Sequence, residues 1–285
     1  MSEKEQEDMI DKRSLEHLSP GRKTLMRGER FAYLPPCEPL RGLISNFTVS
    51  FPDQSTISDA YTIMPHGSVT LVLFHYRAQL YSFLFGPTTR PVRVGDLANQ
   101  CDVIFIVEFQ PAGFFPFGKT DQKELTDKVL PFSSVDFSMD TAVRAIFSAS
   151  CSVDQLLLEF EKELLLRLRF SYPEELAAAI RAIVQTGGVI TSTEIADSAF
   201  YCSRHLNRLF SRYLGLNMKG FSRLVRINRS LRLLSEAANT TAFICEQLGY
   251  YDVSHFVKDF KAVCGITPQQ YRLNMSDFYS EIAKF

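Results

Sequence analysis

One pattern occurs twice in this chain and constrains its fold more than any other feature. Residues 191–215 and 240–265 each read as a short helix, a tight turn and a second helix. In both copies the second helix carries apolar residues spaced three and four apart, which places them on one face. Because glycines and other turn residues separate the helical segments, residues 171–274 are predicted to form an all-helical domain with two helix-turn-helix units.

The second helix of the first copy has one apolar face and one basic face. The apolar residues fall at positions i, i+3, i+4 and i+7, and they are Leu206, Leu209, Phe210 and Tyr213. The other face carries Arg204, Asn207, Arg208, Ser211 and Arg212. Arg and Asn bond bidentately to guanine and adenine in the major groove of DNA. The basic face therefore predicts contacts with base edges.

The second copy holds His255 between Cys245 and Cys264, a pattern that first suggests a metal site or a catalytic pair. At 100° per residue, the apolar stripe of its second helix turns His255 outward, beside Ser254 and Lys258. Both cysteines fall on the apolar side, so three or four ligands cannot converge. We predict no metal, no cofactor and no catalytic residue here. The six cysteines of the chain are expected to be reduced and buried. In the second copy, Thr240 or Thr241 is expected to cap the first helix and Asp252 the second helix.

Charge is distributed unevenly, although the chain has a formal net charge of -1. Residues 171–274 carry 12 Lys and Arg against 8 Asp and Glu. No acidic residue lies between Asp197 and Glu236, whereas eight basic residues do: Arg204, Arg208, Arg212, Lys219, Arg223, Arg226, Arg229 and Arg232. Solvated helix faces usually mix both signs, so this segment favours a surface that faces a polyanion.

The N-terminal half has a different pattern. Residues 29–120 contain short segments rich in Val, Ile, Phe and Tyr, separated by Pro and Gly, as is typical of a β-sandwich or small barrel. Residues 121–170 have helical spacing and are predicted to be a helical linker, which packs on the β-rich part or forms a dimer seam. Residues 1–28 are expected to be a disordered polar tail, and residues 275–285 a C-terminal tail. The predicted fold class is α+β with two domains.

The C-terminal segment resembles the AraC/XylS family of bacterial transcription regulators. In the first copy, "IADSAFYCSRHLNRLF" is similar to the family's Ile/Leu-Ala start and Arg-x-Leu-x-Arg-x-Phe helix. In the second, "GYYDVSHF" and "GITPQQYR" are similar to its Gly-aromatic-x-Asp-x-Ser-x-Phe and Gly-x-Thr-Pro-x-x-Tyr-Arg signatures. The resemblance covers about 100 residues, 171–274. It implies a cytoplasmic, sequence-specific DNA-binding transcription regulator that is not an enzyme.

The resemblance also implies which residues meet DNA. They are Ser203, Arg204, Asn207, Arg208 and Arg212 in the first unit, and Val253, Ser254, His255, Lys258 and Lys261 in the second. Four positions depart from the family: Cys202 replaces a capping Ser, Phe200 replaces a frequent turn Gly, Cys245 replaces the usual Ala, and Lys258 replaces a frequent Arg. We expect the first helix to discriminate bases and the second to contribute more to phosphate positioning.

The N-terminal half resembles, less specifically, the cupin-like sensor domains attached to these regulators. His66 and His75 are nine residues apart, on opposite faces of a regular strand, so a metal-dependent enzyme is not expected. The implied partners are double-stranded DNA, RNA polymerase and a small-molecule effector, with no membrane span, in a monomer or homodimer. A regulator whose N-terminal half binds only a protein partner stays open. An alkyl-transfer enzyme fused to a DNA-binding module is disfavoured, since the cysteine cluster and nucleophile that it needs do not occur.

Overall fold

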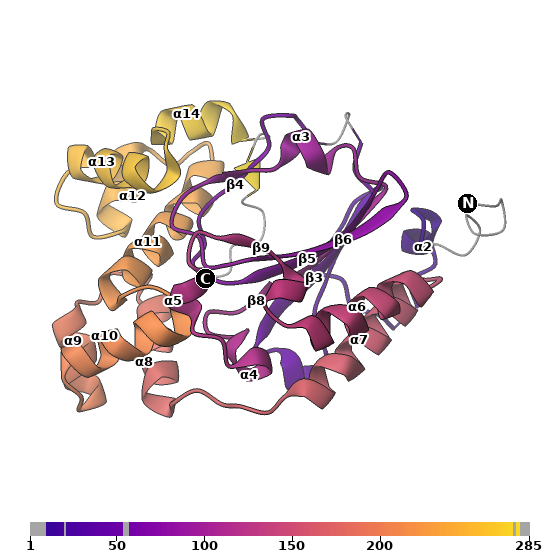
Figure 1. Cartoon of the computed structure of the whole chain (residues 1–285). Coiled ribbons are helices and arrows are strands. Elements are labelled where there is room, and N and C mark those ends of the chain that lie inside the picture. The colour runs from indigo at the N-terminus through magenta and orange to yellow at the C-terminus, as the bar shows by residue number, and fades with distance from the viewer. Residues whose placement is uncertain (1–9, 20, 54–56, 276–277, 280–285) are drawn as a thin grey trace.

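The computed structural model describes residues 10–19, 21–53, 57–275 and 278–279. Its N-terminal part is an antiparallel sheet with two long helices on one face, and its C-terminal part is helical (Figure 1). This arrangement confirms the expected α+β class with two domains. Among the described residues, no helix is both long enough and apolar enough to cross a membrane.

The main sheet has seven strands in the order β1-β2-β3-β8-β5-β6-β9, with antiparallel neighbours throughout. A small sheet of order β10-β4-β7 lies beside it. Alternation explains the strands: in β3, Phe47 and Val49 enter the hydrophobic core, whereas Asn46 and Thr48 point to the other face. The strand bounds are β1 Met26–Arg27, β2 Phe31–Leu34, β3 Ile44–Ser50, β4 Thr62–Ile63, β5 Thr70–Tyr76, β6 Gln79–Phe85, β7 Val92–Arg93, β8 Val103–Phe109, β9 Val129–Pro131 and β10 Phe278–Tyr279.

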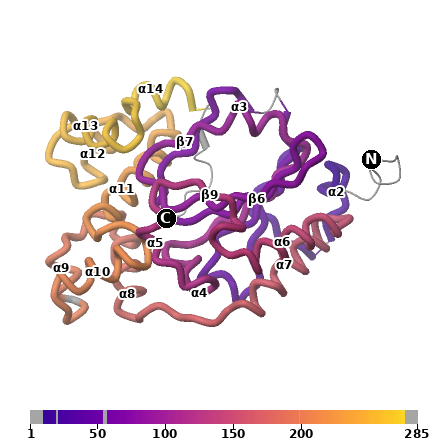
Figure 2. The backbone as a smooth tube through the Cα atoms, in the orientation of Figure 1, coloured from indigo at the N-terminus to yellow at the C-terminus, as the bar shows by residue number. Residues whose placement is uncertain are grey.

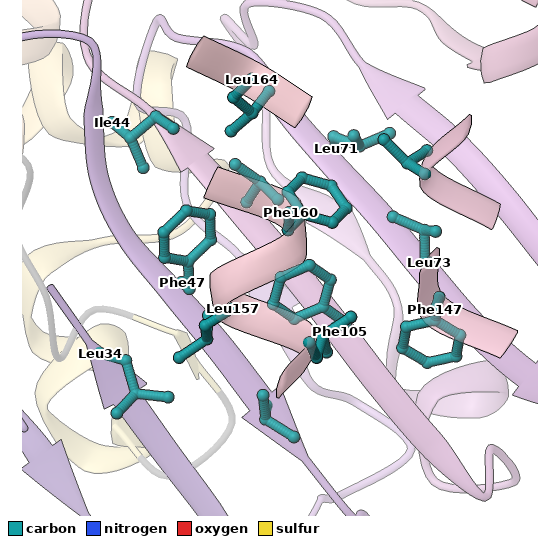
Figure 3. Close-up of a cluster of buried hydrophobic side chains, with 14 of the residues drawn as sticks. Leu34, Ile44, Phe47, Leu71, Leu73, Phe105, Phe147, Leu157, Phe160 and Leu164 are labelled. Carbon is teal, nitrogen blue, oxygen red and sulfur yellow. The ribbon is translucent and has the colours of Figure 1, made fainter. Parts of the chain in front are cut away.

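Helices α6 (Phe137–Ala149) and α7 (Val153–Arg167) cover one face of the main sheet. Figure 3 shows Leu157, Phe160 and Leu164 of α7 against Phe47 and Phe105 of the strands, all of them buried. The rings of Phe105 and Phe160 meet edge to face with centroids 5.0 Å apart. The expectation that this helical segment packs on the β-rich part is thus confirmed. Residues 121–170 are not a linker, however, because β9 pairs with β6 and both helices complete the core.

The N-terminal segment differs from the expected tail. Ile10 and Leu15 are buried in the same core, and β1 pairs with β2. Arg22 forms an ion pair with Asp154 at the start of α7, with 2.8 Å between Nε and Oδ1. Although the composition of this segment is polar, a few apolar side chains suffice to dock its described residues 10–19 and 21–28 on the sheet and helices. Residues 1–9 and 20 lie outside the described residues.

Shorter helical turns connect these elements. They are α2 (Arg13–Glu16), η1 (Glu38–Leu40), α3 (Gly95–Ala98), α4 (Phe115–Gly118), α5 (Gln122–Leu125) and η2 (Phe132–Ser134). An extended connection then runs from α7 to α8, and the tube in Figure 2 shows it passing along the edge of the molecule.

The C-terminal part consists of α8 (Glu174–Gln185), α9 (Ser192–Ala199), α10 (Ser203–Leu214), α11 (Met218–Ser235), α12 (Thr241–Gln247), α13 (Val253–Cys264) and α14 (Pro268–Leu273). Helix α11 joins two cores, one with α8 to α10 and one with α12 to α14. Of the expected C-terminal tail, Phe278–Tyr279 forms β10, which pairs in parallel with β4 of the N-terminal part. The remainder after Met275 lies outside the described residues.

The two parts share apolar contacts and hydrogen bonds. The ring of Phe115 lies 4.3 Å from that of Tyr213 in α10, centroid to centroid. The Thr126 hydroxyl donates to the Gly215 carbonyl at 3.1 Å, at the end of the same helix. In α11, the Asn228 amide donates to the Pro65 carbonyl at 2.8 Å. The first helix-turn-helix unit and α11 are therefore held directly against the N-terminal part.

Candidate nucleic-acid interface

The first unit is built from α9 and α10. A capping box of Thr191 and Glu194 starts α9, which satisfies backbone donors that the helix leaves free. The helix ends at Phe200, whose φ of 57° lies in the left-handed region. The Tyr201 amide then donates to the Ala196 carbonyl at 3.1 Å, closing a Schellman-type turn. Below the turn, Ile195 and Leu206 are buried, so the motif is fixed by its own core.

The start of α10 presents the predicted basic residues to solvent. Arg204 and Arg208 are exposed, and Ser203 is half-buried. Cys202 occupies the N-cap position but makes no side-chain cap bond, so the helix lacks the hydroxyl or carboxylate that usually satisfies its first amides. The Arg208 Nη2 lies 3.1 Å from Nδ1 of His205, one turn earlier.

Asn207 is the one predicted contact on this helix whose amide links α10 to α11. Its Nδ2 donates to the Ser203 carbonyl at 2.9 Å, and its Oδ1 accepts from the Met218 amide at 3.0 Å. The amide thus satisfies the first turn of α11 and links it to α10. The side chain thus has a structural role, while one N–H and one lone pair remain, so its contact with a base edge stays a prediction.

Arg212 lies further along α10, towards the N-terminal part. Its guanidinium carbon is 5.9 Å from the ring centroid of Phe115 and 5.6 Å from that of Tyr213. These cation–π distances place the head group at the junction with the N-terminal part. Of the five predicted residues of this unit, Arg204 and Arg208 are the exposed cations at the beginning of the helix.

The second unit repeats the geometry with different residues. Thr240 caps α12 and Asp252 caps α13, which confirms both expected caps. Gly249, with φ of 65°, stands where the first unit has Phe200, and the Tyr250 amide donates to the Cys245 carbonyl at 3.0 Å. Every predicted contact of this unit is exposed, namely Val253, Ser254, His255, Lys258 and Lys261.

The cysteines of this unit point inward, as the helical phase predicts. Cys245 and Cys264 are buried, and burial raises the pKa of both thiols. The described residues include no group of three or more His, Cys, Asp or Glu that could hold a metal ion. All six cysteines are free, but Cys151 and Cys202 are exposed, so the expectation that every cysteine is buried is wrong. Cys202 is exposed because it lies in the solvent-facing turn before α10.

The long run of basic residues does not form one continuous surface. Arg223 of α11 forms an ion pair with Asp259 of α13, whose other oxygen accepts from the Tyr250 hydroxyl at 2.7 Å. Arg226 donates to the Gly188 carbonyl at 2.6 Å. These two arginines hold helices together instead of facing a polyanion. Sequence reasoning missed this because the acidic partner lies 36 residues from Arg223 along the chain.

Two aromatic residues that were not predicted as contacts stand at the tips of the units. Phe200 is 96% exposed and Tyr251 is 94% exposed. Each precedes a candidate recognition helix by two or three residues. For Phe200, the sequence already indicated an unusual residue, because the family often has glycine at this position of the turn.

Helix α11 sets the relation between the two units. Figure 1 shows α9–α10 and α12–α13 near opposite ends of α11. Its buried residues Phe221 and Val225 pack with the first unit, whereas Ile227 and Leu231 pack with the second. Both second helices therefore keep an exposed N-terminal turn on one common scaffold.

Comparison with known proteins identifies this part of the chain. A family model described as a helix-turn-helix domain matches residues 195–274. This segment is an AraC-type helix-turn-helix domain. The match spans both units of the AraC-type domain and the helix between them. A second model, described as a domain of unknown function (DUF6597), matches residues 32–131, which include the main sheet from β2 to β9.

Curated relatives match a little over a quarter of this chain. An uncharacterized HTH-type transcriptional regulator of Haemophilus influenzae is 28% identical over 83 residues, which are 29% of this chain and 28% of the relative. The uncharacterized HTH-type transcriptional regulator YfiF of Bacillus subtilis is 31% identical over 80 residues, 28% of this chain and 25% of the relative. The chain thus spans less than a third of the length of the curated relatives it matches.

Two solved structures illustrate the range of similarity. A transcriptional regulator with an AraC-type DNA-binding domain from Chromobacterium violaceum is 25% identical, with 35% of this chain and 90% of that chain covered and a TM-score of 0.33. ToxT from Vibrio cholerae is 11% identical, with 75% of this chain and 93% of that chain covered and a TM-score of 0.42. With both scores below 0.5, the assignment rests on the sequence match of the AraC-type domain.

Proposed function

We propose that the chain is a sequence-specific transcription regulator that binds double-stranded DNA with the exposed N-terminal turns of α10 and α13. The observation that carries this proposal is the repeated unit, in which the second helix buries one face and exposes cations on the other. Arg204 and Arg208 lie on α10, and Lys258 and Lys261 on α13, all exposed. Two such helices on one scaffold can enter successive major grooves, whose centres are about 34 Å apart.

The two helices have different roles on DNA, base discrimination for α10 and phosphate contacts for α13. Arginine donates bidentately to guanine, so Arg204 and Arg208 supply base discrimination. Lysine is a point charge with flexible geometry, which suits Lys258 and Lys261 to phosphate contacts. Ser254 and His255 add shorter hydrogen-bonding groups at the start of α13.

The N-terminal part supplies the regulatory input through its contacts with α10 and α11. A small-molecule effector that alters the packing of Phe115 or the loop at Pro65 changes how the first unit is held, because both contact the DNA-binding part directly. A protein partner on the same part would act through the same contacts, and RNA polymerase is the partner that activation requires. Thermal stabilisation by candidate small molecules distinguishes an effector from a protein partner.

The test is DNA binding by the full chain on genomic fragments that include its own promoter, measured against salt. About six phosphate contacts predict a slope near -5 for the logarithm of affinity against the logarithm of salt concentration. A preferred fragment is expected, bound more tightly than random duplexes of the same length. A flat salt response without a preferred fragment would overturn the proposal.

A further inference from the structure

Two helices and the turn between α9 and α10 meet at His205, a residue that none of the predicted contacts includes. On one side, Nδ1 of its ring lies 3.1 Å from Nη2 of Arg208 in the same helix. On the other, Nε2 lies 3.7 Å from Oε1 of Glu175 at the start of α8. The ring of Tyr201, in the turn before α10, stacks on it with centroids 5.1 Å apart and planes inclined by 18°. The ring is thus fixed in plane and in direction.

The chemistry of arginine determines the state of this ring. A guanidinium group only donates hydrogen bonds and does not lose its proton in proteins. Nδ1 of His205 must therefore accept, which requires the neutral tautomer with the proton on Nε2, facing Glu175. A second proton on Nδ1 would remove the acceptor and place a positive charge against the guanidinium. The same proton would strengthen the attraction between the ring and the Glu175 carboxylate. Protonation would therefore break the hydrogen bond with Arg208 and favour the ion pair with Glu175.

We propose that His205 is a positioning residue for Arg208: the neutral ring holds the guanidinium ready for a guanine edge, and protonation releases it. The inference rests on the proposed DNA-binding function. Holding a long, exposed side chain before binding reduces the conformational entropy that is lost when it orders on DNA. One donor of the guanidinium is used by Nδ1, and the other donors stay available for bidentate contacts.

The second unit lacks this arrangement and serves as the internal control. His255 occupies a similar place at the start of α13, and it contacts the ring of Tyr250 edge to face at 5.3 Å. The basic residue one turn later is Lys258, whose single ammonium group offers no bidentate contact. The charged and titratable groups that face His205 come from three elements: Glu175 from α8, Tyr201 from the turn and Arg208 from α10. Histidine changes charge within the ordinary pH range, so the effect is measurable in solution.

The experiment measures a specificity ratio for the full chain, its affinity for the preferred promoter fragment divided by that for a random duplex of equal length. The ratio is compared at about pH 8 and about pH 6, where histidine side chains in general change charge. For the native sequence the specificity ratio should fall about threefold to tenfold at the lower pH. This is smaller than the full discrimination that one bidentate contact provides, because the guanidinium is released but not removed. The ratio cancels the general gain in affinity from added positive charge.

Two substitutions of His205 distinguish the effect of its hydrogen-bond acceptor from the effect of its stacking ring. His205→Asn places an amide oxygen near the position of Nδ1 and cannot take up the proton, so the ratio should stay high at both pH values. His205→Phe keeps the stacking ring without an acceptor, so the ratio should be low at both. His255→Asn should leave the pH dependence unchanged. In an Arg208→Ala background, His205→Phe should have no further effect.

The outcomes separate the two proposals. If the native chain prefers no fragment at either pH, the DNA-binding function itself fails. If it discriminates between fragments but His205→Phe matches the native ratio at the higher pH, His205 does not position Arg208. Persistence of the pH dependence in His205→Asn overturns the role of the proton. Matching thermal unfolding of both variants shows that a change in the ratio is not a loss of folding.

Discussion

The two helix-turn-helix units have the same backbone geometry but are stabilised differently. The second unit has a turn glycine at Gly249, an Asp252 cap and an internal polar network around Asp259. The first has Phe200 in the turn, an N-cap cysteine without a cap bond, and contacts with the N-terminal part. The unit with the arginines suited to base readout is thus the one with weaker local supports and a direct contact with the N-terminal part. Under the proposed function, base discrimination and regulatory contact are therefore combined in one helix.

The largest effect on stability is expected from Asp259→Ala in the second unit. The carboxylate accepts from both Arg223 and the buried Tyr250 hydroxyl, so its loss leaves two donors without their acceptor. Arg223 is 41% exposed and can regain water, which limits the expected cost to about 2 kcal/mol. Hydrogen exchange should show faster opening of α12 and α13 with α10 unchanged. Equal loss of protection in α9 and α10 would mean that the units are not supported independently.

Substitutions of the two exposed cations test the division of work on DNA. Arg208→Ala should cost about 1–3 kcal/mol on the preferred fragment and much less on random duplexes. Lys258→Ala should weaken binding by a similar small factor on all sequences, because phosphate contacts carry no sequence information. Fluorescence anisotropy on both kinds of duplex measures this, with Arg181→Ala as the control for charge alone. A uniform loss for Arg208→Ala would contradict the assignment of base readout to α10.

Substitutions of the turn residues should have opposite effects on the stability of the two units. Phe200→Gly should stabilise the first unit by about 1 kcal/mol, because a left-handed conformation strains any residue with a Cβ atom. Gly249→Ala should destabilise the second by about 1–2 kcal/mol, since φ is 65° and the new Cβ would lie 3.1 Å from Val189 Cγ1. Thermal unfolding of both variants gives the comparison. If Phe200→Gly stabilises but weakens DNA binding, the exposed ring itself contacts DNA.

High pH should weaken the second unit through Tyr250. Burial, followed by the hydrogen bond to Asp259, raises the pKa of Tyr250 above its ordinary value. The unfolded chain loses this proton near pH 10, whereas the folded chain retains it, so the stabilisation is complete below pH 10 and declines as pH rises further. At about pH 11 the loss should be about 1 kcal/mol. Tyr250→Phe should flatten the dependence measured by thermal unfolding, and an unchanged slope would argue against a buried, protonated Tyr250.

Much of the candidate site could be predicted from periodicity. The phase of α13 placed His255 outward and Cys264 inward, and both caps of the second unit followed from residue type. Asn207 could not be predicted in the same way. Its residue type suits adenine, but its role depends on the Met218 amide, which reaches it only once α11 turns back against α10.

The sequence by itself determined the helical units, the strands and the class of interface. Helix and strand periods are local, and each copy of the motif is contained in about 25 consecutive residues. Only the tertiary structure decided which basic residues stay free. Arg223 of α11 pairs with Asp259 of α13, and His205 of α10 lies beside Glu175 of α8. Such pairings depend on how distant segments pack, and no local period encodes them. The same reason explains why the polar residues 10–19 dock on the sheet: the few apolar side chains among them gain a core that the segment does not contain.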